Sequence, residues 1–396
     1  MKRIAGLICC IAFITVFSSF AEQITIIKQA SLSNPKLIYN GMTGNQEFSE
    51  YVKSNLQKCG WFDVIPSGTA KYTVDGIILG NKATLNVKGE INFNVSINID
   101  PNNSKWSSYK LVDLLLNKIF NIPGICASRF VFVAQHNGKK DLMIADFDGS
   151  NVKQLTGLNA LALEPSWCMN NSLIVYTLIH NNFADVIGLN LSSGKNTVLA
   201  NFPGLNTGGA ISPNGKQMAL ILSKDKNVDL YVKKAYGGKE LMKITKGNGA
   251  VAGCPAWSPD SRKLCFVSNM KMNRPSLYIA DIDSGKIYPI RTLGGEAVSP
   301  SWSPDGSKIV YSAKMGSNYT LGVYDIEAGT TSLVEINSAG DWFSSSWAPD
   351  SRHVVCSRRL NYFSQLYVVD TLSGEARKGL NSKYNTTSPD WSALYR

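Results

Sequence analysis

The strongest constraint on the fold is a short phrase that recurs along the last two thirds of the chain. It joins a tryptophan to a turn sequence, and its fullest form is Pro300-Ser301-Trp302-Ser303-Pro304-Asp305-Gly306. The tryptophan position falls at residues 167, 211, 257, 302, 347 and 391, with isoleucine at 211, so the repeat is 44 to 46 residues long. A repeat of this length predicts the four-stranded blades of a β-propeller.

Each part of the phrase predicts a part of the blade. Ser-Pro-Asp-Gly favours a tight turn, because proline presets φ, aspartate bonds nearby backbone and glycine accepts a positive φ. Apolar runs that follow, such as Ile309-Val310-Tyr311 and Leu321-Gly322-Val323, predict the second and third strands. The proline two residues before tryptophan predicts an innermost edge strand, since proline donates no ladder hydrogen bond. We interpret the tryptophans as packing between blades, with a sugar-stacking platform as the alternative.

The two ends of the repeat region predict how the propeller closes. Residues 128–156 supply a second, third and fourth strand without a preceding tryptophan phrase. Pro389-Asp390-Trp391-Ser392, at the other end, is a first strand with no blade after it. Joining these pieces predicts an all-β six-bladed propeller over residues 126–396, closed by the C-terminal strand. Such closure removes two exposed sheet edges.

The chain before the repeats predicts a leader and a small domain. Lys2 and Arg3 precede an apolar run, and Ser19-Phe20-Ala21 places small residues before Glu22, so residues 1–21 are predicted to be a signal peptide. The alternative is a retained membrane anchor, for which the run is short. Residues 22–125 predict an α/β domain, with helices at residues 46–59 and 107–120 and strands at residues 61–65, 72–79 and 91–97.

Six of the eight cysteines follow the predicted leader, and their spacing matches no zinc pattern. Cys254 and Cys265 flank a turn symmetrically, so an unbulged hairpin would place them opposite each other and permit a disulfide. A one-residue bulge would destroy that register. The pairing therefore depends on the regularity of this hairpin.

Composition and motifs argue against several classes of function. The net charge is +11, but the basic residues are spread out, so we predict no nucleic-acid binding. The three histidines have no metal-binding spacing, and no Gly-x-Ser-x-Gly motif is present, so we predict no metal, no cofactor and no catalytic residue. The glycine-rich run at residues 247–253 is interpreted as a connection between blades, with a nucleotide-binding loop as the alternative. The aspartate that ends each third strand is interpreted as a turn former, with a cation-binding ring of carboxylates as the alternative.

The order of these parts resembles the TolB family, the periplasmic component of the Tol-Pal system of Gram-negative bacteria. The likeness covers nearly all of the chain after the leader. It is most specific at Asn55-Leu56-Gln57-Lys58-Cys59-Gly60-Trp61-Phe62, at Leu222-Ser223-Lys224 with Asp229-Leu230-Tyr231-Val232, and at Pro389-Asp390-Trp391-Ser392. The resemblance implies a non-enzymatic periplasmic adaptor that supports outer-membrane integrity and cell division.

The resemblance also implies two partner sites. The propeller mouth would hold the peptidoglycan-associated lipoprotein Pal, at the matching positions Leu205, Asn206, Thr207, Gly208, Ala252, Gly253, Glu296 and Ala297. The N-terminal arm would engage the inner-membrane protein TolA, through Glu22, Gln23, Ile24, Thr25, Ile26 and Ile27. We expect a monomer that meets membranes only through its partners. A polysaccharide lyase and a glycan-binding module are the competing classes.

Overall fold

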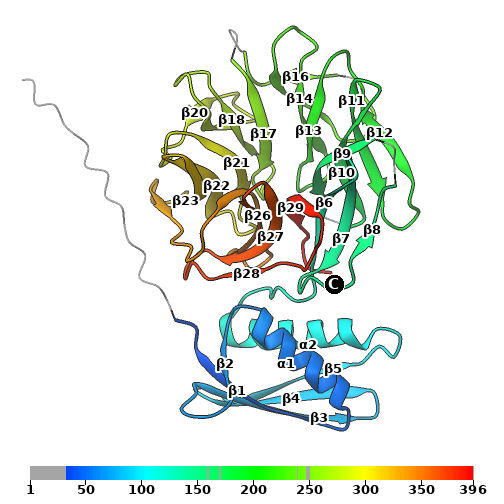
Figure 1. Cartoon of the computed structure of the whole chain (residues 1–396), viewed down its shortest axis with the longest axis vertical. Coiled ribbons are helices and arrows are strands. Elements are labelled where there is room, and N and C mark those ends of the chain that lie inside the picture. Colours follow the sequence, from blue (N-terminus) through cyan, green and yellow to red (C-terminus); the bar gives the residue numbers. More distant parts are fainter. Residues whose placement is uncertain (1–32, 158–159, 169–170, 239, 247–249, 396) are drawn as a thin grey trace, which may run out of the picture.

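The computed structural model describes residues 33–157, 160–168, 171–238, 240–246 and 250–395. It contains a small α/β domain followed by a β-propeller, and the two lie side by side (Figure 1). This order of parts confirms the sequence prediction. The predicted signal peptide, residues 1–21, and the predicted arm from Glu22 to Ile27 lie outside the described residues.

The α/β domain is a five-stranded sheet whose two helices lie between the sheet and the propeller (Figure 1). The strand order is β2-β1-β3-β4-β5, with β1 parallel to β2 and β3 and the other pairs antiparallel. The bounds are β1 Lys36–Thr43, α1 Gln46–Lys58, β2 Asp63–Ile65, β3 Tyr72–Leu79, β4 Lys82–Gly89, β5 Phe93–Asn98 and α2 Ser104–Phe120. The sequence predicted both helices, β2, β3 and β5, but not β1 or β4.

Asparagine caps determine where both helices begin. The Asn45 side chain accepts the N–H of Phe48 at 3.0 Å, and Asn103 accepts the N–H of Trp106 at 3.3 Å. Such caps satisfy backbone donors that have no partner within the helix. The Asn103 cap explains why α2 begins three residues before the predicted start at Ser107.

A buried carboxylate fixes the connection between α2 and the propeller. Asp113 accepts the backbone N–H groups of Ile125, Cys126 and Ala127 at 2.8 to 2.9 Å. Burial raises the pKa of Asp113 to about 6, although these three hydrogen bonds favour the ionised form. The path of the chain into the propeller is therefore set by one side chain of α2.

The propeller contains four separate four-stranded sheets and one eight-stranded sheet. The four-stranded sheets are β13 Asn206–Ile211, β14 Gln217–Leu222, β15 Asp229–Lys234 and β16 Met242–Lys243; β17 Ala252–Trp257, β18 Lys263–Ser268, β19 Ser276–Asp281 and β20 Ile287–Pro289; β21 Ala297–Trp302, β22 Lys308–Met315, β23 Asn318–Asp325 and β24 Thr331–Leu333; and β25 Asp341–Trp347, β26 His353–Leu360, β27 Phe363–Asp370 and β28 Ala376–Lys378. The eight-stranded sheet contains β6 Arg129–His136, β7 Lys139–Asp146, β8 Lys153–Gln154, β9 Leu161–Trp167, β10 Leu173–His180, β11 Phe183–Asn190, β12 Asn196–Ala200 and β29 Asn385–Trp391.

The eight-stranded sheet differs from the separate four-stranded blades that the sequence predicts. Its order is β12-β11-β10-β9-β7-β6-β29, with β8 paired to β7. One parallel bridge, between Lys140 of β7 and Leu161 of β9, joins β29-β6-β7-β8 to β9-β10-β11-β12. The difference arises because β9 begins early enough to reach β7.

The C-terminal strand joins the two ends of the propeller region. β29 pairs antiparallel with β6, from Asn385 opposite Gln135 to Trp391 opposite Phe130. The Trp391 indole N–H donates to Ser128 Oγ at 2.7 Å, which ties the last strand to the connection from α2. The sequence predicted this pairing of the final strand with the strand that begins at Arg129.

The repeated tryptophans pack between neighbouring sheets, as predicted. The indole N–H of Trp257 donates to Ala210 O at 2.9 Å, and that of Trp347 donates to Ser301 O at 3.0 Å. Trp167 bonds Asp390 O at 3.0 Å in the same way. These three rings are at most 9% exposed, so they are not available as a sugar-stacking platform.

Every innermost strand carries a bulge, and in β17 this bulge removes the regular register that a disulfide between Cys254 and Cys265 would need. Residues 164, 208, 254, 299, 344 and 388 have φ between 49° and 62°, and each lies at a register shift. In β17 the shift places Cys265 opposite Ala256, not opposite Cys254. Cys254 is exposed, Cys265 is buried, and both are free thiols. The bulge therefore separates the two sulfur atoms that a regular hairpin would have paired.

Asp390 connects three consecutive innermost strands. Its carboxylate accepts the N–H of Trp167 in β9 at 2.7 Å and the hydroxyl of Ser346 in β25 at 2.6 Å. Burial raises the pKa of Asp390 from 3.8 to about 6, against the effect of these hydrogen bonds. Ionised Asp390 is therefore costly in the folded state.

We expect Asp390→Asn to reduce the loss of stability that accompanies a rise in pH from 4 to 7. Because the folded pKa is the higher one, the folded protein holds a proton between pH 3.8 and 6 that the unfolded chain has released. Protonated Asp390 thus contributes to the free energy of unfolding at pH 4. This contribution, about 3 kcal/mol, is lost as the pH rises through 6. Urea unfolding at pH 4.5, 5.5 and 7 measures the difference, and Asp113 contributes the same trend in both proteins. If the free energy of unfolding changed with pH by the same amount in wild type and variant, this account would be contradicted.

Candidate functional site

The propeller has two distinct faces, and the α/β domain contacts one of them, at the sheets that contain β6–β8 and β25–β28. The turn face carries the Ser-Pro-Asp-Gly turns and the turns after each third strand. The hairpin face carries the tips between second and third strands and the connections into the innermost strands. Trp61 donates to Asp350 at 2.9 Å and Lys105 to Ser150 at 2.7 Å, and both acceptors lie in turns of the turn face. The described α/β domain thus leaves the hairpin face uncovered.

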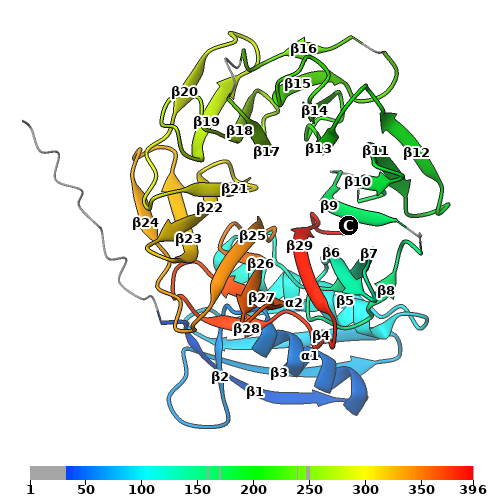
Figure 2. The same cartoon turned by 45° about the horizontal axis from the view of Figure 1, so that its top comes forward.

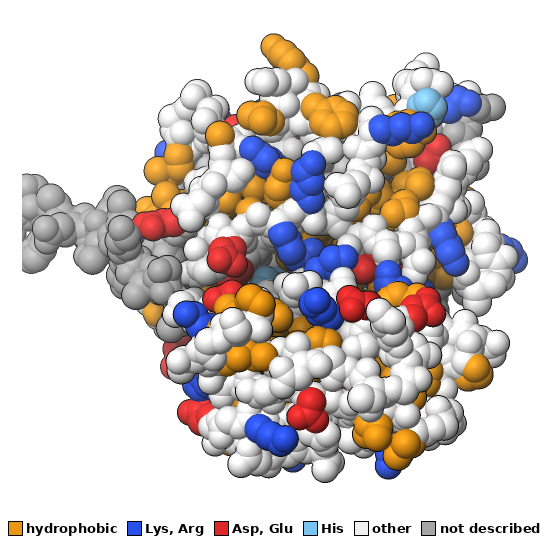
Figure 3. Space-filling model, turned by 60° about the horizontal axis from the view of Figure 1, so that its bottom comes forward, with side chains coloured by type: hydrophobic (Ala, Val, Ile, Leu, Met, Phe, Trp, Pro, Cys, Tyr) orange, Lys and Arg blue, Asp and Glu red, His pale blue; other side chains and the backbone are white. Residues whose placement is uncertain are grey.

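The contact between the two parts is strongly charged. Figure 3 shows the side of the molecule that carries the α/β domain, where Lys and Arg side chains gather beside Asp and Glu across the middle of the view. Lys58 and Lys105 lie 3.6 and 3.1 Å from the buried Asp148 carboxylate. Burial alone would raise the pKa of Asp148, but hydrogen bonds from Ser150 and the two lysines hold it below its usual value. Ion pairs therefore orient the α/β domain on the propeller.

The predicted mouth residues lie together on the hairpin face. They occupy the beginnings of β13, β17 and β21, which are the innermost strands of three consecutive sheets around the centre of the ring (Figure 2). The eight predicted residues therefore lie on one continuous part of the ring. Their individual roles differ, because some side chains are exposed and others are occupied by internal hydrogen bonds.

Asn206 braces a loop and is not free to meet a partner. It is 1% exposed, and its side chain bonds the N–H of Phe202 at 2.7 Å, the carbonyl of Phe202 at 2.6 Å and that of Gly204 at 3.1 Å. The neighbouring Leu205 is 37% exposed. Of these two predicted contacts, Leu205 alone offers its side chain to solvent.

Thr207 and Gly208 converge on a carboxylate that the sequence analysis did not single out. Glu164 Oε2 accepts the hydroxyls of Thr207 and Thr177 and, at 3.2 Å, the N–H of Gly208. Glu164 occupies the position of Gly208, Cys254 and Ser299 in other innermost strands, at the residue that takes a positive φ. Comparing the residue immediately before each Pro-x-Trp phrase would have found it.

The remaining mouth residues combine a buried floor with one charged group. Ala252 and Ala297 are 4% and 1% exposed, whereas a Cβ added at Gly253 would meet open space. Glu296 bonds Lys314 at 2.5 Å and the hydroxyl of Tyr319 at 2.7 Å. These two hydrogen bonds lower the pKa of Glu296, so the group is ionised and already paired. The surface at β17 is therefore the most open part of the predicted mouth.

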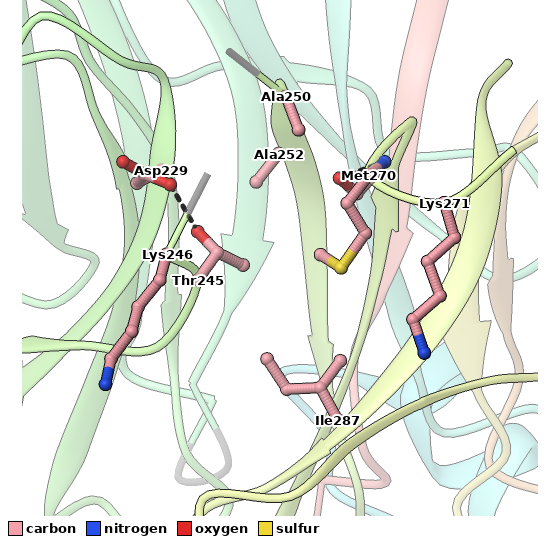
Figure 4. Close-up of a pocket in the computed structure, with 9 residues that line it drawn as sticks. Asp229, Thr245, Lys246, Ala250, Ala252, Met270, Lys271 and Ile287 are labelled. Carbon is pink, nitrogen blue, oxygen red and sulfur yellow. Dashed lines mark hydrogen bonds between the residues drawn. The ribbon is translucent and has the colours of Figure 1, made fainter. Parts of the chain in front are cut away.

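A hollow of about 250 Å³ lies beside the mouth, between the sheets of β13–β16 and β17–β20. It is lined by Asp229, Thr245, Lys246, Ala250, Ala252, Ser268, Met270, Lys271 and Ile287. Figure 4 shows Lys246 and Lys271 extending along opposite sides of the hollow, with Met270 and Ile287 between them. Thr245 donates to Asp229 at 2.7 Å, and Lys243 lies 2.7 Å from the other carboxylate oxygen.

The start of the described chain is anchored where the two parts of the molecule meet. The Asn34 side chain donates to Gly60 O at 2.9 Å and accepts from Arg352 at 2.6 Å. Arg352 also bonds both carboxylate oxygens of Asp370, and its guanidinium lies 4.5 Å from the centre of the Trp61 ring. The predicted arm, Glu22 to Ile27, is outside the described residues.

The predicted turn aspartates have the role that the sequence assigned to them. Asp281 accepts the N–H and hydroxyl of Ser284, and Asp325 accepts the N–H of Ala328 at 2.8 Å. Within the described ranges, no three His, Cys, Asp or Glu side chains form a metal-binding group. No helix in the same ranges is long and apolar enough to cross a membrane. The exposed residues at the mouth offer surface for binding.

Comparison with known proteins decides the family. The family model described as the TolB beta propeller domain matches residues 116–395. The chain belongs to this family. A Protein TolB homolog from Chlorobium chlorochromatii is 29% identical over 147 residues, which are 36% of this chain and 32% of that protein. A Tol-Pal system protein TolB from Bordetella pertussis is 27% identical over 178 residues, 45% of this chain and 40% of that protein.

These sequence matches span less than half the length of either TolB relative. The fold likeness extends much further. The crystal structure of TolB from Acinetobacter baumannii matches with a TM-score of 0.81 over 92% of this chain and 98% of that chain, at 20% identity. The α/β domain and the propeller of this TolB-family chain thus have the same arrangement as a known structure.

Proposed function

We propose that this TolB-family chain is a periplasmic, non-enzymatic adaptor of a Tol-Pal envelope system, supporting outer-membrane integrity and cell division. The observation that carries the proposal is the family match over the propeller, together with a hairpin face that the α/β domain leaves uncovered. Relatives are named Tol-Pal system proteins. A rigid ring with one free face suits an adaptor, since a specific interface needs about 800 Å² on each partner and no reactive group.

The proposal includes a six-bladed ring. Counting β29-β6-β7-β8 and β9-β10-β11-β12 as two blades, joined by the bridge from Lys140 to Leu161, gives six with the four separate sheets. The pairing of β29 with β6 would then close the ring. In this scheme residues 22–125 form the α/β domain and residues 126–396 form the propeller.

We assign the hairpin face to the peptidoglycan-associated lipoprotein Pal. Leu205, Thr207, Gly208, Gly253 and Glu296 offer exposed atoms on this face, and their backbones are held by innermost strands. Preorganised backbone lowers the entropy lost on association. Asn206, Ala252 and Ala297 would support this surface from beneath.

We assign the arm from Glu22 to Ile27 to the inner-membrane protein TolA. Support comes from the position of Asn34, which holds the start of the described chain against both Gly60 and Arg352. A partner that pulls on the arm would act directly on this contact between the α/β domain and the propeller. The chain would meet membranes only through these two partners, as a monomer.

We expect Gly253→Trp to weaken lipoprotein binding at least tenfold without changing thermal stability. The Cβ of residue 253 has open space around it, so the indole would project over the proposed interface. Calorimetric titration with the soluble domain of the organism's own lipoprotein measures the affinity. The matched control is Glu327→Trp, which adds the same ring at an exposed turn of the opposite face. Equal affinities for the two variants would move the lipoprotein site away from β17.

A further inference from the structure

The hollow between β13–β16 and β17–β20 has an unusual distribution of charge around it. Its one lining carboxylate, Asp229, is fully buried, accepts the Thr245 hydroxyl and lies 2.7 Å from the Lys243 ammonium. Asp229 is therefore neutralised from within the protein. It contributes little repulsion toward an anion that approaches from solvent.

The cations around the hollow are not neutralised in this way. Lys246 and Lys271 line it from opposite sides (Figure 4), and neither has an ion-pair partner in the described part of the chain. Lys226 and Arg274, on the two neighbouring hairpin tips, are likewise exposed and unpaired among those residues. Asp225, the acidic residue of the first tip, is bonded to Lys224 at 2.8 Å. The surroundings of the hollow thus carry an excess of positive charge.

The interior of the hollow is apolar over much of its lining. Ala250, Ala252, Met270 and Ile287 supply carbon surface, and the exposed side chains of Val251 and Met272 extend it outward. The volume of about 250 Å³ is below the range of roughly 300–1,000 Å³ that is usual for complete small-molecule sites. It suits one side chain of a protein partner, in the manner of an anchor residue that fills a pocket.

We infer that this hollow and its four cations bind an acidic peptide segment of a protein partner, with one apolar side chain in the hollow and flanking carboxylates on the lysines. Both features are needed for this inference. Exposed lysines alone would attract any polyanion, whereas the apolar lining requires a buried carbon side chain between the charges. The inference deepens the proposed function, on which it rests for the partner's identity but not for the chemistry of recognition.

The location of the hollow agrees with such a role. Ala252, which begins β17, lines the hollow, and the next residue, Gly253, belongs to the predicted mouth, so the hollow lies beside the mouth. Both views of the whole molecule place β16 and β17 on the side of the ring away from the α/β domain (Figures 1 and 2). A partner seated at the mouth can therefore extend a segment into the hollow without meeting the α/β domain.

The test uses the full-length mature protein and three capped peptides, SEELEES, SEEGEES and SQQLQQS. The Met270 methyl resonance reports entry of a side chain into the hollow. We expect SEELEES to shift it in a saturable manner with a dissociation constant on the order of 1 mM or tighter. The other two peptides are expected to bind at least fivefold more weakly, since one lacks the apolar anchor and the other lacks the charges. Equal binding of all three, or no shift with SEELEES, would overturn the inference.

Charge-reversed variants separate this site from general electrostatic attraction. Lys246→Glu/Lys271→Glu should weaken SEELEES binding at least tenfold. The control Lys195→Glu/Lys216→Glu makes the same change of net charge at exposed turns of the opposite face and should leave binding unchanged. Equal losses in both variants would overturn the inference, because attraction would then follow net charge alone. The inference would also be overturned if inorganic polyphosphate displaced SEELEES and SEEGEES bound as tightly as SEELEES. The surface would then bind polyanions in general.

A parallel titration with the lipoprotein separates the two proposals. Suppose that wild type and Lys246→Glu/Lys271→Glu bind the lipoprotein equally, and that SEELEES does not bind more tightly than the other two peptides. The inference is then wrong and the proposed function stands. If the peptides behave as expected but the lipoprotein does not bind to wild type, the proposed function is wrong and the acidic-segment site stands. A tenfold loss for the double variant in both titrations supports both.

Discussion

Trp391→Ala is expected to lower the free energy of unfolding of the propeller by about 3–5 kcal/mol, as large aromatic truncations in cores do. Trp391 is 5% exposed, lies edge-on to Phe130 at 5.9 Å and donates to Ser128 at 2.7 Å. The substitution removes packing between β29 and β6 and leaves a buried hydroxyl without its donor. Urea unfolding monitored by circular dichroism measures the change.

An aromatic residue outside the core provides the matched control for this prediction. Tyr362 is 96% exposed at the hairpin tip between β26 and β27, so Tyr362→Ala should change stability by no more than about 0.5 kcal/mol. If Trp391→Ala costs less than about 1 kcal/mol, the C-terminal strand is not what holds the ends of the propeller together.

Arg352→Ala is expected to lower stability by about 3–5 kcal/mol and to loosen the α/β domain from the propeller. Arg352 is 9% exposed and bonds Asp370, while its guanidinium also reaches Asn34 and covers Trp61. Burial alone would raise the pKa of Asp370, but the hydrogen bonds and charge of Arg352, with the nearby His353, hold it below its usual value. Removing the guanidinium therefore leaves a buried anion without its main partner.

The repeat itself supplies the control for this second substitution. Arg262 occupies the same position after Ser-Pro-Asp-Ser that Arg352 has after Ala-Pro-Asp-Ser. Its side chain is 69% exposed, and so is most of its partner Asp283, so Arg262→Ala should cost less than about 1 kcal/mol. Small-angle scattering is expected to show a larger radius of gyration for Arg352→Ala only. Equal compactness and equal stability of the two variants would show that the α/β domain is held by other contacts.

The propeller was predictable because its turn chemistry repeats. Ser258 and Ser303 each bond the aspartate two residues later, at 2.5 and 2.6 Å, so the same short sequence builds the same turn in each sheet. The tryptophans likewise repeat one packing role. A local sequence that determines its own local structure can be interpreted without knowledge of the rest of the chain.

The features that sequence analysis missed depend on distant residues. β4 alternates, but its pairing with both β3 and β5 became evident only from the sheet order. The bulges fall at Glu164, Cys254 and Ser299, which have no intrinsic preference for a positive φ, so nothing local marked them. For that reason the sequence left open whether Cys254 and Cys265 lie opposite each other, and the register of β17 shows that they do not.

For the candidate site, the sequence could suggest residues but not the orientation of their side chains. The predicted residues lie at the beginnings of β13, β17 and β21, but the Asn206 side chain bonds within its own loop, and the sequence analysis did not single out Glu164. Which side chain of a loop faces solvent depends on hydrogen bonds across the loop. The hollow beside Ala252 depends on two adjacent sheets and has no signature in either one alone.

The central claim is that the hairpin face holds the peptidoglycan-associated lipoprotein. Titration of wild-type residues 22–396 with the soluble domain of that lipoprotein, at low salt, tests it most directly. The account predicts one-to-one binding with a dissociation constant in the micromolar range or tighter, as specific interfaces of standard size give. Absence of binding with both proteins at about 100 µM would contradict it.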